Sequence, residues 1–109
     1  MSYDEQLAER IRSALASVSV VEKKMFGGLQ FLVDGKIAIG ATVDGDLLVR
    51  CDPSRTDDLI GRPGAQRADM RGRKMSAGWI TVSPEETRGA DLQFWVAVAL
   101  ENRALDHRP

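Results

Sequence analysis

Residues 23–28 of the chain read Lys23-Lys24-Met25-Phe26-Gly27-Gly28, and this segment lies between two stretches whose apolar residues alternate. This alternation predicts a first strand over residues 18–25 and a second over residues 29–33. The two glycines permit a bulge or a corner of a sheet between these strands. Because the residues after the glycines continue as a strand and not as a helix, the segment does not have the form of a phosphate-binding loop.

Two Asp-Gly pairs divide the following residues into further strands. Asp34-Gly35 and Asp44-Gly45 are typical of two-residue type I′ turns, which need a positive φ at both central positions. Apolar residues alternate over residues 37–43, between the turns, and again over residues 47–51. Two-residue turns join antiparallel neighbours, so residues 18–51 predict an antiparallel meander of four strands.

The first predicted helix precedes this meander. Ser2 and Glu5 have the spacing of a capping box, in which each side chain accepts a hydrogen bond from the free backbone N–H of the other residue. Apolar residues then recur every three or four positions. We therefore expect an amphipathic helix over about residues 3–17.

A short helix, a fifth strand and a final helix are predicted after the meander. Asp52-Pro53 combines an N-cap with a proline at the first helical position, and this helix is expected to end at Gly61. Residues 79–83 read as a strand. Ser83-Pro84-Glu85-Glu86 repeats the capping-box pattern, and the apolar stripe of the final helix begins at about Asp91.

The predicted elements follow the order α-β-β-β-β-α-β-α. This order predicts an α+β fold of two layers, in which helices pack on an antiparallel sheet of about five strands. A chain of 109 residues has the usual size of one domain, and its 43% of hydrophobic and 28% of charged residues are typical of a globular protein. We interpret residues 1–109 as a single domain.

The composition also bears on where the protein resides. The single cysteine, Cys51, has no partner for an internal disulfide, and the acidic N-terminal residues differ from the basic start of a secretory signal. The longest apolar runs fall far short of the ~20 residues that span a bilayer. We expect a cytoplasmic protein that does not contact a membrane.

The sequence supplies few groups for catalysis or for metal binding. His107 is the only histidine, and we expect it to lie in a solvated C-terminal segment, away from any nucleophile. His107 and Cys51 alone do not supply the usual nitrogen and sulfur ligands of a metal site. Cys51 is interpreted as a small buried hydrophobe, and Asp57 and Asp58 as part of a solvated helix surface. We predict no enzymatic activity, no metal site and no cofactor.

Two basic segments are candidate contact surfaces in a chain whose net charge is −1. In the first segment, Lys23 and Lys24 precede Gly27 and Gly28, and lysines beside a flexible glycine corner suit a phosphate group or an acidic partner. The alternative is a strand corner whose lysines stay in water or guard the edge of the sheet.

The second basic segment lies within residues 62–78, where the apolar residues show no clear period. Arg71, Arg73 and Lys74 gather positive charge there, and Trp79 follows as an aromatic neighbour. Such a segment suits the DNA backbone, RNA or an acidic protein surface, and the alternative is a solvated loop. The overall charge does not support a free-standing nucleic-acid binder, so nucleic acid stays an open alternative to a protein partner.

The final helix bears on the oligomeric state. Phe94 and Val98 lie off its main apolar stripe. Apolar residues around so much of a helix indicate burial on two sides, either by a second subunit or because the helix is central to the core. We expect a homodimer.

Several motifs occur in order along nearly the whole chain. They are Lys23-Lys24-Met25-Phe26-Gly27-Gly28-Leu29, Phe31, Asp34-Gly35, Gly40, Leu48-Val49-Arg50, Pro63-Gly64, Asp69-Met70-Arg71-Gly72-Arg73-Lys74-Met75 and Gly78-Trp79. This pattern resembles the TfoX (Sxy) N-terminal domain family. The resemblance implies a two-layer fold with an antiparallel sheet, and a regulatory role in bacteria with no catalytic residues.

The named members of that family regulate competence for DNA uptake, in some bacteria together with the cyclic-AMP receptor protein at promoters, and they carry a second, C-terminal domain. We therefore predict a non-catalytic regulatory domain, a transcriptional co-regulator that contacts a protein of the transcription machinery, or nucleic acid, through its two basic segments. The alternative function is a small-molecule-binding module, with a pocket between sheet and helices lined by Phe26, Phe31 and Trp79.

Overall fold

The main sheet has six strands, all antiparallel, in the order β1-β2-β3-β4-β8-β5. The structure is a computed structural model that describes residues 4–25, 28–42, 45–70, 73–75 and 77–106, with the backbone alone for Met70, Arg73, Lys74 and residues 103–106. The strands are β1 Val21–Met25, β2 Gly28–Val33, β3 Lys36–Ala41, β4 Leu47–Arg50, β5 Ala65–Arg67 and β8 Trp79–Val82. Two further strands, β6 Asp69–Met70 and β7 Arg73–Lys74, pair with each other in a separate hairpin.

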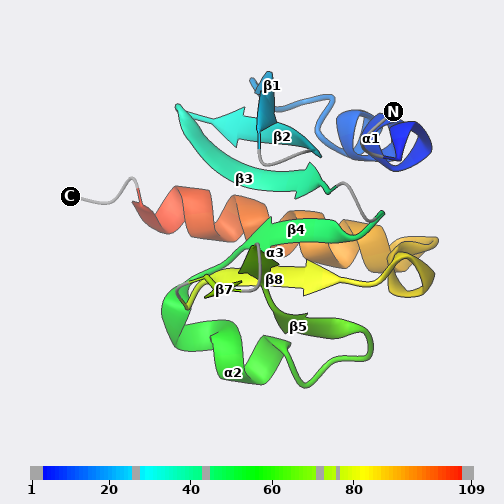
Figure 1. Ribbon diagram of the computed structural model, residues 1–109. Coiled ribbons are helices and arrows are strands. Elements are labelled where there is room, and N and C mark those ends of the chain that lie inside the picture. The colour runs from blue at the N-terminus through cyan, green and yellow to red at the C-terminus, as the bar shows by residue number, and fades with distance from the viewer. Residues whose placement is uncertain (1–3, 26–27, 43–44, 71–72, 76, 107–109) are drawn as a thin grey trace.

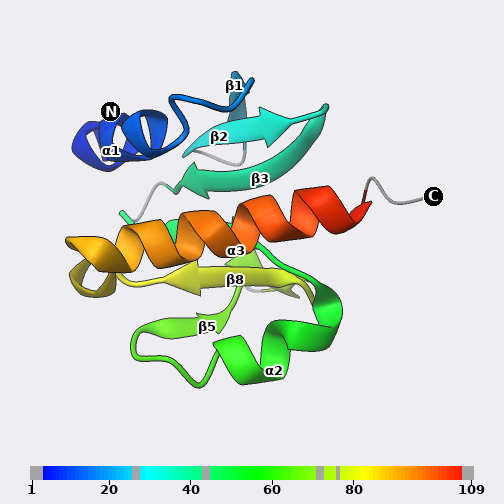
Figure 2. The ribbon, with the colours of Figure 1, turned by 180° about the vertical axis from the view of Figure 1, so that it is seen from behind.

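The helices lie on one side of this sheet. They are α1 Glu5–Ala14, the 3₁₀ helix η1 Pro53–Arg55 with α2 Thr56–Leu59, the 3₁₀ helix η2 Pro84–Thr87, and α3 Ala90–Asp106. The long α3 runs behind β4 and β8 in Figure 1 and in front of them in Figure 2. It contacts β3 and β4, while α1 contacts both α3 and β3. The predicted two-layer α+β fold is thus confirmed, with six strands where about five were expected.

The core lies between the sheet and these two helices. One row of directly paired residues crosses four neighbouring strands and consists of Phe31, Ile39, Val49 and Ile80. All four are fully buried, and they belong to one hydrophobic cluster with Ile11 of α1 and Trp95 of α3. Burial of each such side chain stabilises the fold by about 1.5–3 kcal/mol, so this row fixes which face of the sheet α3 covers.

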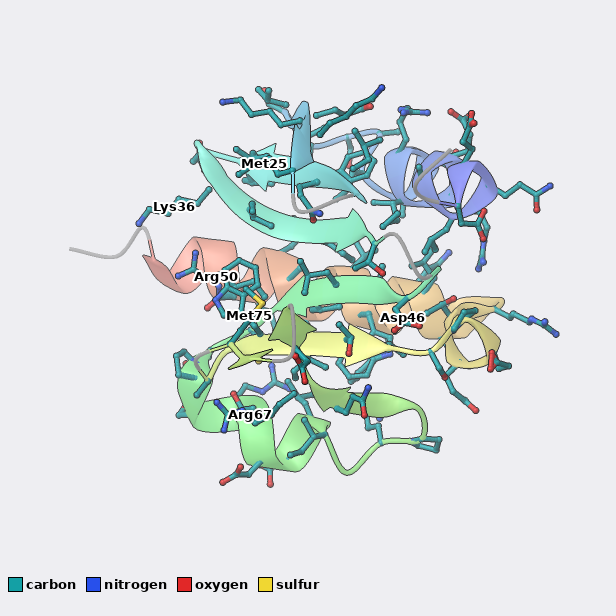
Figure 3. All side chains as sticks on the ribbon, viewed as in Figure 1. Met25, Lys36, Asp46, Arg50, Arg67 and Met75 are labelled. Atoms are coloured by element: carbon teal, nitrogen blue, oxygen red, sulfur yellow. The ribbon has the colours of Figure 1, made fainter. Side chains whose placement is uncertain are left out.

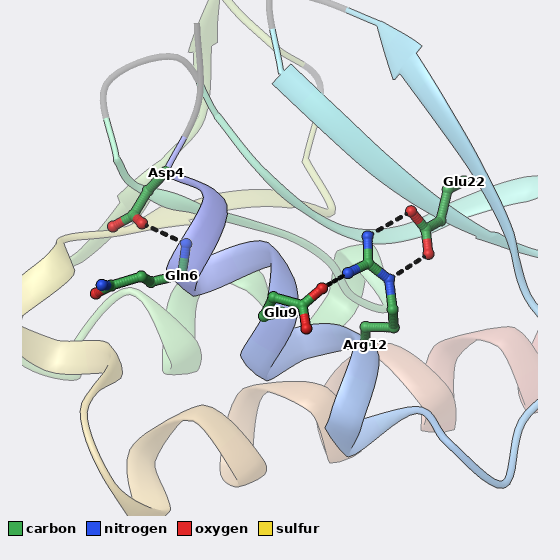
Figure 4. Close-up of polar contacts among 5 residues, drawn as sticks. All are labelled: Asp4, Gln6, Glu9, Arg12 and Glu22. Atoms are coloured by element: carbon green, nitrogen blue, oxygen red, sulfur yellow. Dashed lines mark hydrogen bonds and ion pairs between the residues drawn. The ribbon is translucent and has the colours of Figure 1, made fainter. Parts of the chain in front are cut away.

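The first helix begins at a different cap from the predicted one. The carboxylate of Asp4 accepts hydrogen bonds from the backbone N–H groups of Gln6 and Leu7, at 2.9 and 3.2 Å (Figure 4). Aspartate is as good an N-cap as serine, so the helix starts at Glu5 and ends at Ala14 instead of covering residues 3–17. Ser2 lies outside the described residues.

The two predicted turns have different outcomes. Asp34 and Gly35 have φ angles of 54° and 83°, as a type I′ turn requires, so this turn is confirmed. At the second turn, the N–H of Thr42 donates to the carbonyl of Asp46 at 2.9 Å, and the N–H of Gly45 donates to the carbonyl of Thr42 at 3.2 Å. The loop is therefore one residue longer than predicted, with Gly45 at a φ of 86° as its last residue.

The caps after the meander also differ. Asp52 accepts a hydrogen bond from the N–H of Ser54 at 3.0 Å and Pro53 follows it, as predicted, although the helical residues end at Leu59 and not at Gly61. The side chain of Ser83 makes no capping hydrogen bond, so the second capping box is wrong. A 3₁₀ helix follows it and closes before α3 begins at Ala90.

Three short strands fall in the region where no period was found. They are β5, β6 and β7, of three, two and two residues. Strands this short do not show an alternating pattern, and β5 lies at the edge of the sheet, with a neighbouring strand on one side only. In the described part of the chain, no helix is both long and apolar enough to cross a membrane.

Candidate functional site

The sheet has one face covered by α3 and one face turned away from it, which we call the open face. Phe31, Val49 and Ile80 point toward the helices, and neighbouring residues in a strand point to opposite sides. The open face is therefore formed by the intervening residues, which include Lys23, Gln30, Gly40, Leu48, Arg50, Trp79 and Thr81.

The two lysines of the first basic segment do not share a face. β1 is an edge strand, and both Lys23 and Lys24 are exposed on it. Lys23 pairs with Gln30 and lies on the open face, whereas Lys24 pairs with Leu29 of the core and points to the side of the helices. Only Lys23 can therefore join a contact surface on the open face.

Gly28 has a structural role in the sheet. It begins β2 and pairs with Met25. A Cβ atom at this position would lie 2.1 Å from the backbone oxygen of Ala41, closer than any side chain tolerates. Glycine is needed here because the neighbouring strand approaches so closely, which accounts for Gly28 without a partner, and its contact role stays a prediction. Gly27 lies outside the described residues.

Arg50 and Trp79 form a half-buried pair on the open face. They are direct partners in the register of β4 and β8, and the guanidinium carbon of Arg50 lies 5.0 Å from the centre of the Trp79 ring. Figure 3 shows Arg50 at the end of β4, beside β8. A guanidinium over an indole is attracted to the ring's electrons, which holds the positive charge at a fixed place on the sheet. Trp79 was predicted as a site residue, and Arg50 was not.

The second basic segment lies away from the first, beside β5 and β8 (Figure 1). β1 is one edge and β5 is the other, and the hairpin of β6 and β7 follows β5. The N–H of Met75 donates to the carbonyl of Ala68 at 2.9 Å, and Nη2 of Arg67 donates to the carbonyl of Met75 at 2.8 Å, which attaches the hairpin to β5. The N–H of Ala68 also donates to the carbonyl of Trp79 at 2.9 Å, so the hairpin lies beside β8 as well as β5, and β2, β3 and β4 lie between β1 and these two strands.

Three of the predicted contact residues belong to this hairpin region. The backbones of Arg73 and Lys74 form β7, paired with Met70 and Asp69. Their side chains, and the whole of Arg71, lie outside the described parts of the chain. Whether these three side chains contact a partner stays a prediction.

Cys51 is a structural residue. Its side chain is 1% exposed, and its sulfur lies 3.8 Å from the hydroxyl of Thr56, which in turn accepts a hydrogen bond from the N–H of Gly78 at 2.9 Å. Burial raises the pKa of the Cys51 thiol above its ordinary value, so the reactive thiolate is disfavoured. The prediction of a buried hydrophobe at Cys51 is confirmed.

Acidic groups and metal ligands do not gather in the described part of the chain. Asp57 and Asp58 are both exposed on α2, as predicted. No cluster of three or more histidine, cysteine, aspartate or glutamate side chains there has the arrangement of a metal site. His107 lies outside the described residues.

The pocket predicted between sheet and helices is not lined by the aromatic residues proposed for it. Phe31 is fully buried in the core, whereas Trp79 lies on the open face. Phe26 lies outside the described residues. A groove of 360 Å³ runs instead between α1 and α3, with Arg10, Ser13, Leu92 and Gln93 among its lining residues.

The apolar residues around α3 are accounted for within one chain. Val98 is 4% exposed and belongs to the core. The ring of Phe94 is covered by the guanidinium of Arg62, 3.7 Å from its centre, and meets Trp95 edge to face at 5.1 Å. The expected homodimer therefore gains no support from these two residues.

Comparison with known proteins gives one match. The family model described as the TfoX N-terminal domain matches residues 4–103. No curated protein and no solved structure matches the chain. The matched segment contains every motif on which the resemblance rested, so the predicted family is confirmed.

Proposed function

The chain belongs to the TfoX N-terminal domain family, and we propose that it is a non-catalytic regulatory domain that contacts an acidic protein surface of the transcription machinery through its open face. The observation that carries the proposal is the Arg50–Trp79 pair, held together at 5.0 Å on a sheet face that α3 does not cover. Arginine and tryptophan are the residues that most often dominate the binding energy of protein interfaces.

The charge of the chain favours a protein partner over nucleic acid. Its net charge is −1, so its overall field does not attract a polyanion such as DNA. A local positive site remains at Arg50, with Lys23 exposed on the same face. Such a site suits a partner of matching local charge, whose approach depends on complementary patches and not on total charge.

The proposal is tested by binding to purified bacterial RNA polymerase, with and without the cyclic-AMP receptor protein, at about 50 mM and about 200 mM salt. Arg50→Gln removes the charge from the open face and is expected to weaken binding about tenfold. Lys36→Gln is the matched control, because Lys36 is an exposed lysine at the first position of β3. It is expected to leave the affinity unchanged.

A second pair of variants separates the two basic segments. Lys23→Gln acts on the open face, and Arg71→Ala/Arg73→Ala acts on the β6–β7 region. We expect Lys23→Gln to weaken binding and the double variant to act independently of it, since β2, β3 and β4 lie between β1 and the strands that hold the hairpin. Absence of binding by the wild type, or equal affinities of Arg50→Gln and Lys36→Gln, would remove the proposal. Binding to promoter DNA alone would reassign the open face to nucleic acid.

A further inference from the structure

The outer edge of β1 is the most exposed strand edge in the described part of the sheet. Four of the five residues of β1 are exposed, and Val21, at 57% exposed, is the only exposed large hydrophobic side chain among the described residues. Figures 1 and 2 both show β1 at the margin of the molecule, with no labelled element beyond its outer side. The N–H and C=O groups along that side have no strand to pair with, which makes the edge a template for another strand.

The geometry of antiparallel pairing restricts how two copies of β1 can meet. In an edge strand, only alternate residues direct their backbone N–H and C=O groups outward. These residues must pair with equivalent residues of the second copy, so odd-numbered residues face odd-numbered ones and even-numbered residues face even-numbered ones. For two identical strands related by a two-fold axis, one residue must therefore lie opposite its own equivalent in the second copy, with the axis midway between the two. We name each register by that residue.

The charges select one of these registers. With the axis at Lys23, all five residues of β1 are paired, and Glu22 of each copy lies opposite Lys24 of the other. Val21 of each copy then lies opposite Met25 of the other. Each of these axes sets one charged residue opposite itself, two lysines at Lys23 or Lys24 and two glutamates at Glu22. Only the axis at Lys23 also forms two Glu–Lys pairs across the strands. Opposite charges across strands stabilise a pair and like charges destabilise it, so the axis at Lys23 is preferred.

We propose that the occupant of this edge is a second copy of the chain, paired antiparallel through β1 about Lys23. The two six-stranded sheets then form one continuous sheet. The other edge, β5, has three residues against five in β1, and the β6–β7 hairpin is attached to it, so it offers a shorter template. This inference rests on the β1 edge and does not require the proposed function, although it places the two Lys23 side chains together on the open face.

Charge reversal at the two paired positions tests the register. Glu22→Lys and Lys24→Glu each turn both Glu–Lys pairs into like-charge pairs, so each is expected to raise the dissociation constant of its own dimer about tenfold. An equimolar mixture of the two variants is expected to recover the wild-type affinity, because both pairs in the mixed dimer again have opposite charges. Sedimentation velocity on the full chain measures all three.

Two controls keep the result interpretable. Glu22 also accepts hydrogen bonds from Arg12, so Arg12→Gln shows how far loss of that contact alone changes the dissociation constant, and thermal melts confirm that each variant is folded. Arg50→Gln is expected to leave the dimer intact while it weakens partner binding, so failure of one proposal is distinguishable from failure of the other. A wild type that is monomeric at millimolar concentration would overturn the inference. A mixture no tighter than either single variant would overturn it as well, and in that case the lysines guard the edge.

Discussion

The two strands of the first hairpin are neighbours in the chain and in the sheet, yet their surroundings are opposite. All six residues of β2 are buried, whereas four of the five residues of β1 are exposed. β2 lies between β1 and β3, while β1 has a neighbour on one side only. Although the two strands pair with each other, the side chains of β2 belong to the interior of the protein and those of β1 to its surface.

The burial of β2 extends to the open face, where a polar residue occupies a position that resembles a core site. Gln30 is fully buried, and its Nε2 donates to the carbonyl of Met25 at 3.2 Å. Its side chain lies over Gly40, where a Cβ atom would come within 1.8 Å of Oε1 of Gln30. The open face is thus closed over β2 and β3, and it presents side chains chiefly at β1 and at the Arg50–Trp79 pair.

The largest difference between the two strands is expected in folding stability. Phe31→Ala removes a fully buried ring from the central row of the core and should lower the free energy of unfolding by about 3–5 kcal/mol. Val21→Ala, on the exposed strand, should change it by no more than about 0.5 kcal/mol. Urea unfolding followed by circular dichroism measures both. Similar losses for the two variants would show that β1 contributes to the core.

Gly28 of β2 and Gly40 of β3 allow a second comparison, between a glycine that faces backbone and one that faces mainly a side chain. Gly28→Ala places a Cβ against the backbone of Ala41, which cannot move aside, so a loss of about 3 kcal/mol is expected. Gly40→Ala meets chiefly the end of the Gln30 side chain, with the backbone oxygen of Leu29 at 2.9 Å as a lesser contact, and about 1–3 kcal/mol is expected. Gln30→Ala should relieve the second clash and leave the first unchanged, which a double-mutant cycle on urea unfolding measures. Equal relief at both glycines would contradict this reading.

Local chemistry made much of the fold predictable from the sequence. Asp34-Gly35 predicts a type I′ turn because few other residue pairs accept the positive φ angles that this turn needs. Asp52-Pro53 combines an N-cap with proline, which a helix accepts in its first turn and not in its interior. The meander followed from alternation over residues 18–51. The choice between two nearby N-cap residues is harder to predict from the sequence. Ser2 was predicted as the N-cap of α1, whereas Asp4 is the N-cap in the structure.

The candidate site was less predictable because its residues meet through long-range pairing. Arg50 ends β4 and Trp79 begins β8, and the residues between them form a helix, a strand and a hairpin. Sequence patterns do not show that β8 pairs with β4 after this long connection. The separation of Lys23 from Lys24, by contrast, follows from the strand prediction itself, because consecutive residues of a strand face opposite sides. That both lysines contact a partner stays a prediction, but the sequence already indicates that they do so from opposite faces of the strand.

A smaller effect is expected from the one ion pair that joins β1 to α1. Nε and Nη2 of Arg12 donate to the carboxylate of Glu22 at 2.6 and 2.7 Å, and this hydrogen bonding holds the pKa of Glu22 below its ordinary value (Figure 4). A lowered pKa in the folded state means that the stabilisation is present above the unfolded-state pKa and is lost as the pH falls through the folded-state pKa.

The corresponding test compares Glu22→Gln with the wild type by urea unfolding at neutral pH and at about pH 3. Because the pair is largely solvated, Glu22→Gln should cost under about 1 kcal/mol at neutral pH, and the difference should shrink at the acidic pH. A difference that grows on acidification would contradict the assigned role of Arg12. Both proteins are measured at the same low concentration, below the dissociation constant of the dimer, so that dimerisation does not enter the comparison.

The smallest expected change in folding stability is at Lys23 of β1. Variants of this residue separate the contribution of β1 to folding from its contribution to the dimer. In the Lys24→Glu background, Lys23→Gln should leave the free energy of unfolding within about 0.5 kcal/mol, because the side chain is exposed on an edge strand. In the otherwise wild-type chain the same substitution removes the like-charge pair at the two-fold axis, so the dimer should tighten about threefold. Sedimentation velocity measures the second effect. A dimer weakened by Lys23→Gln would place the axis elsewhere, because only the register about Lys23 sets this residue opposite itself.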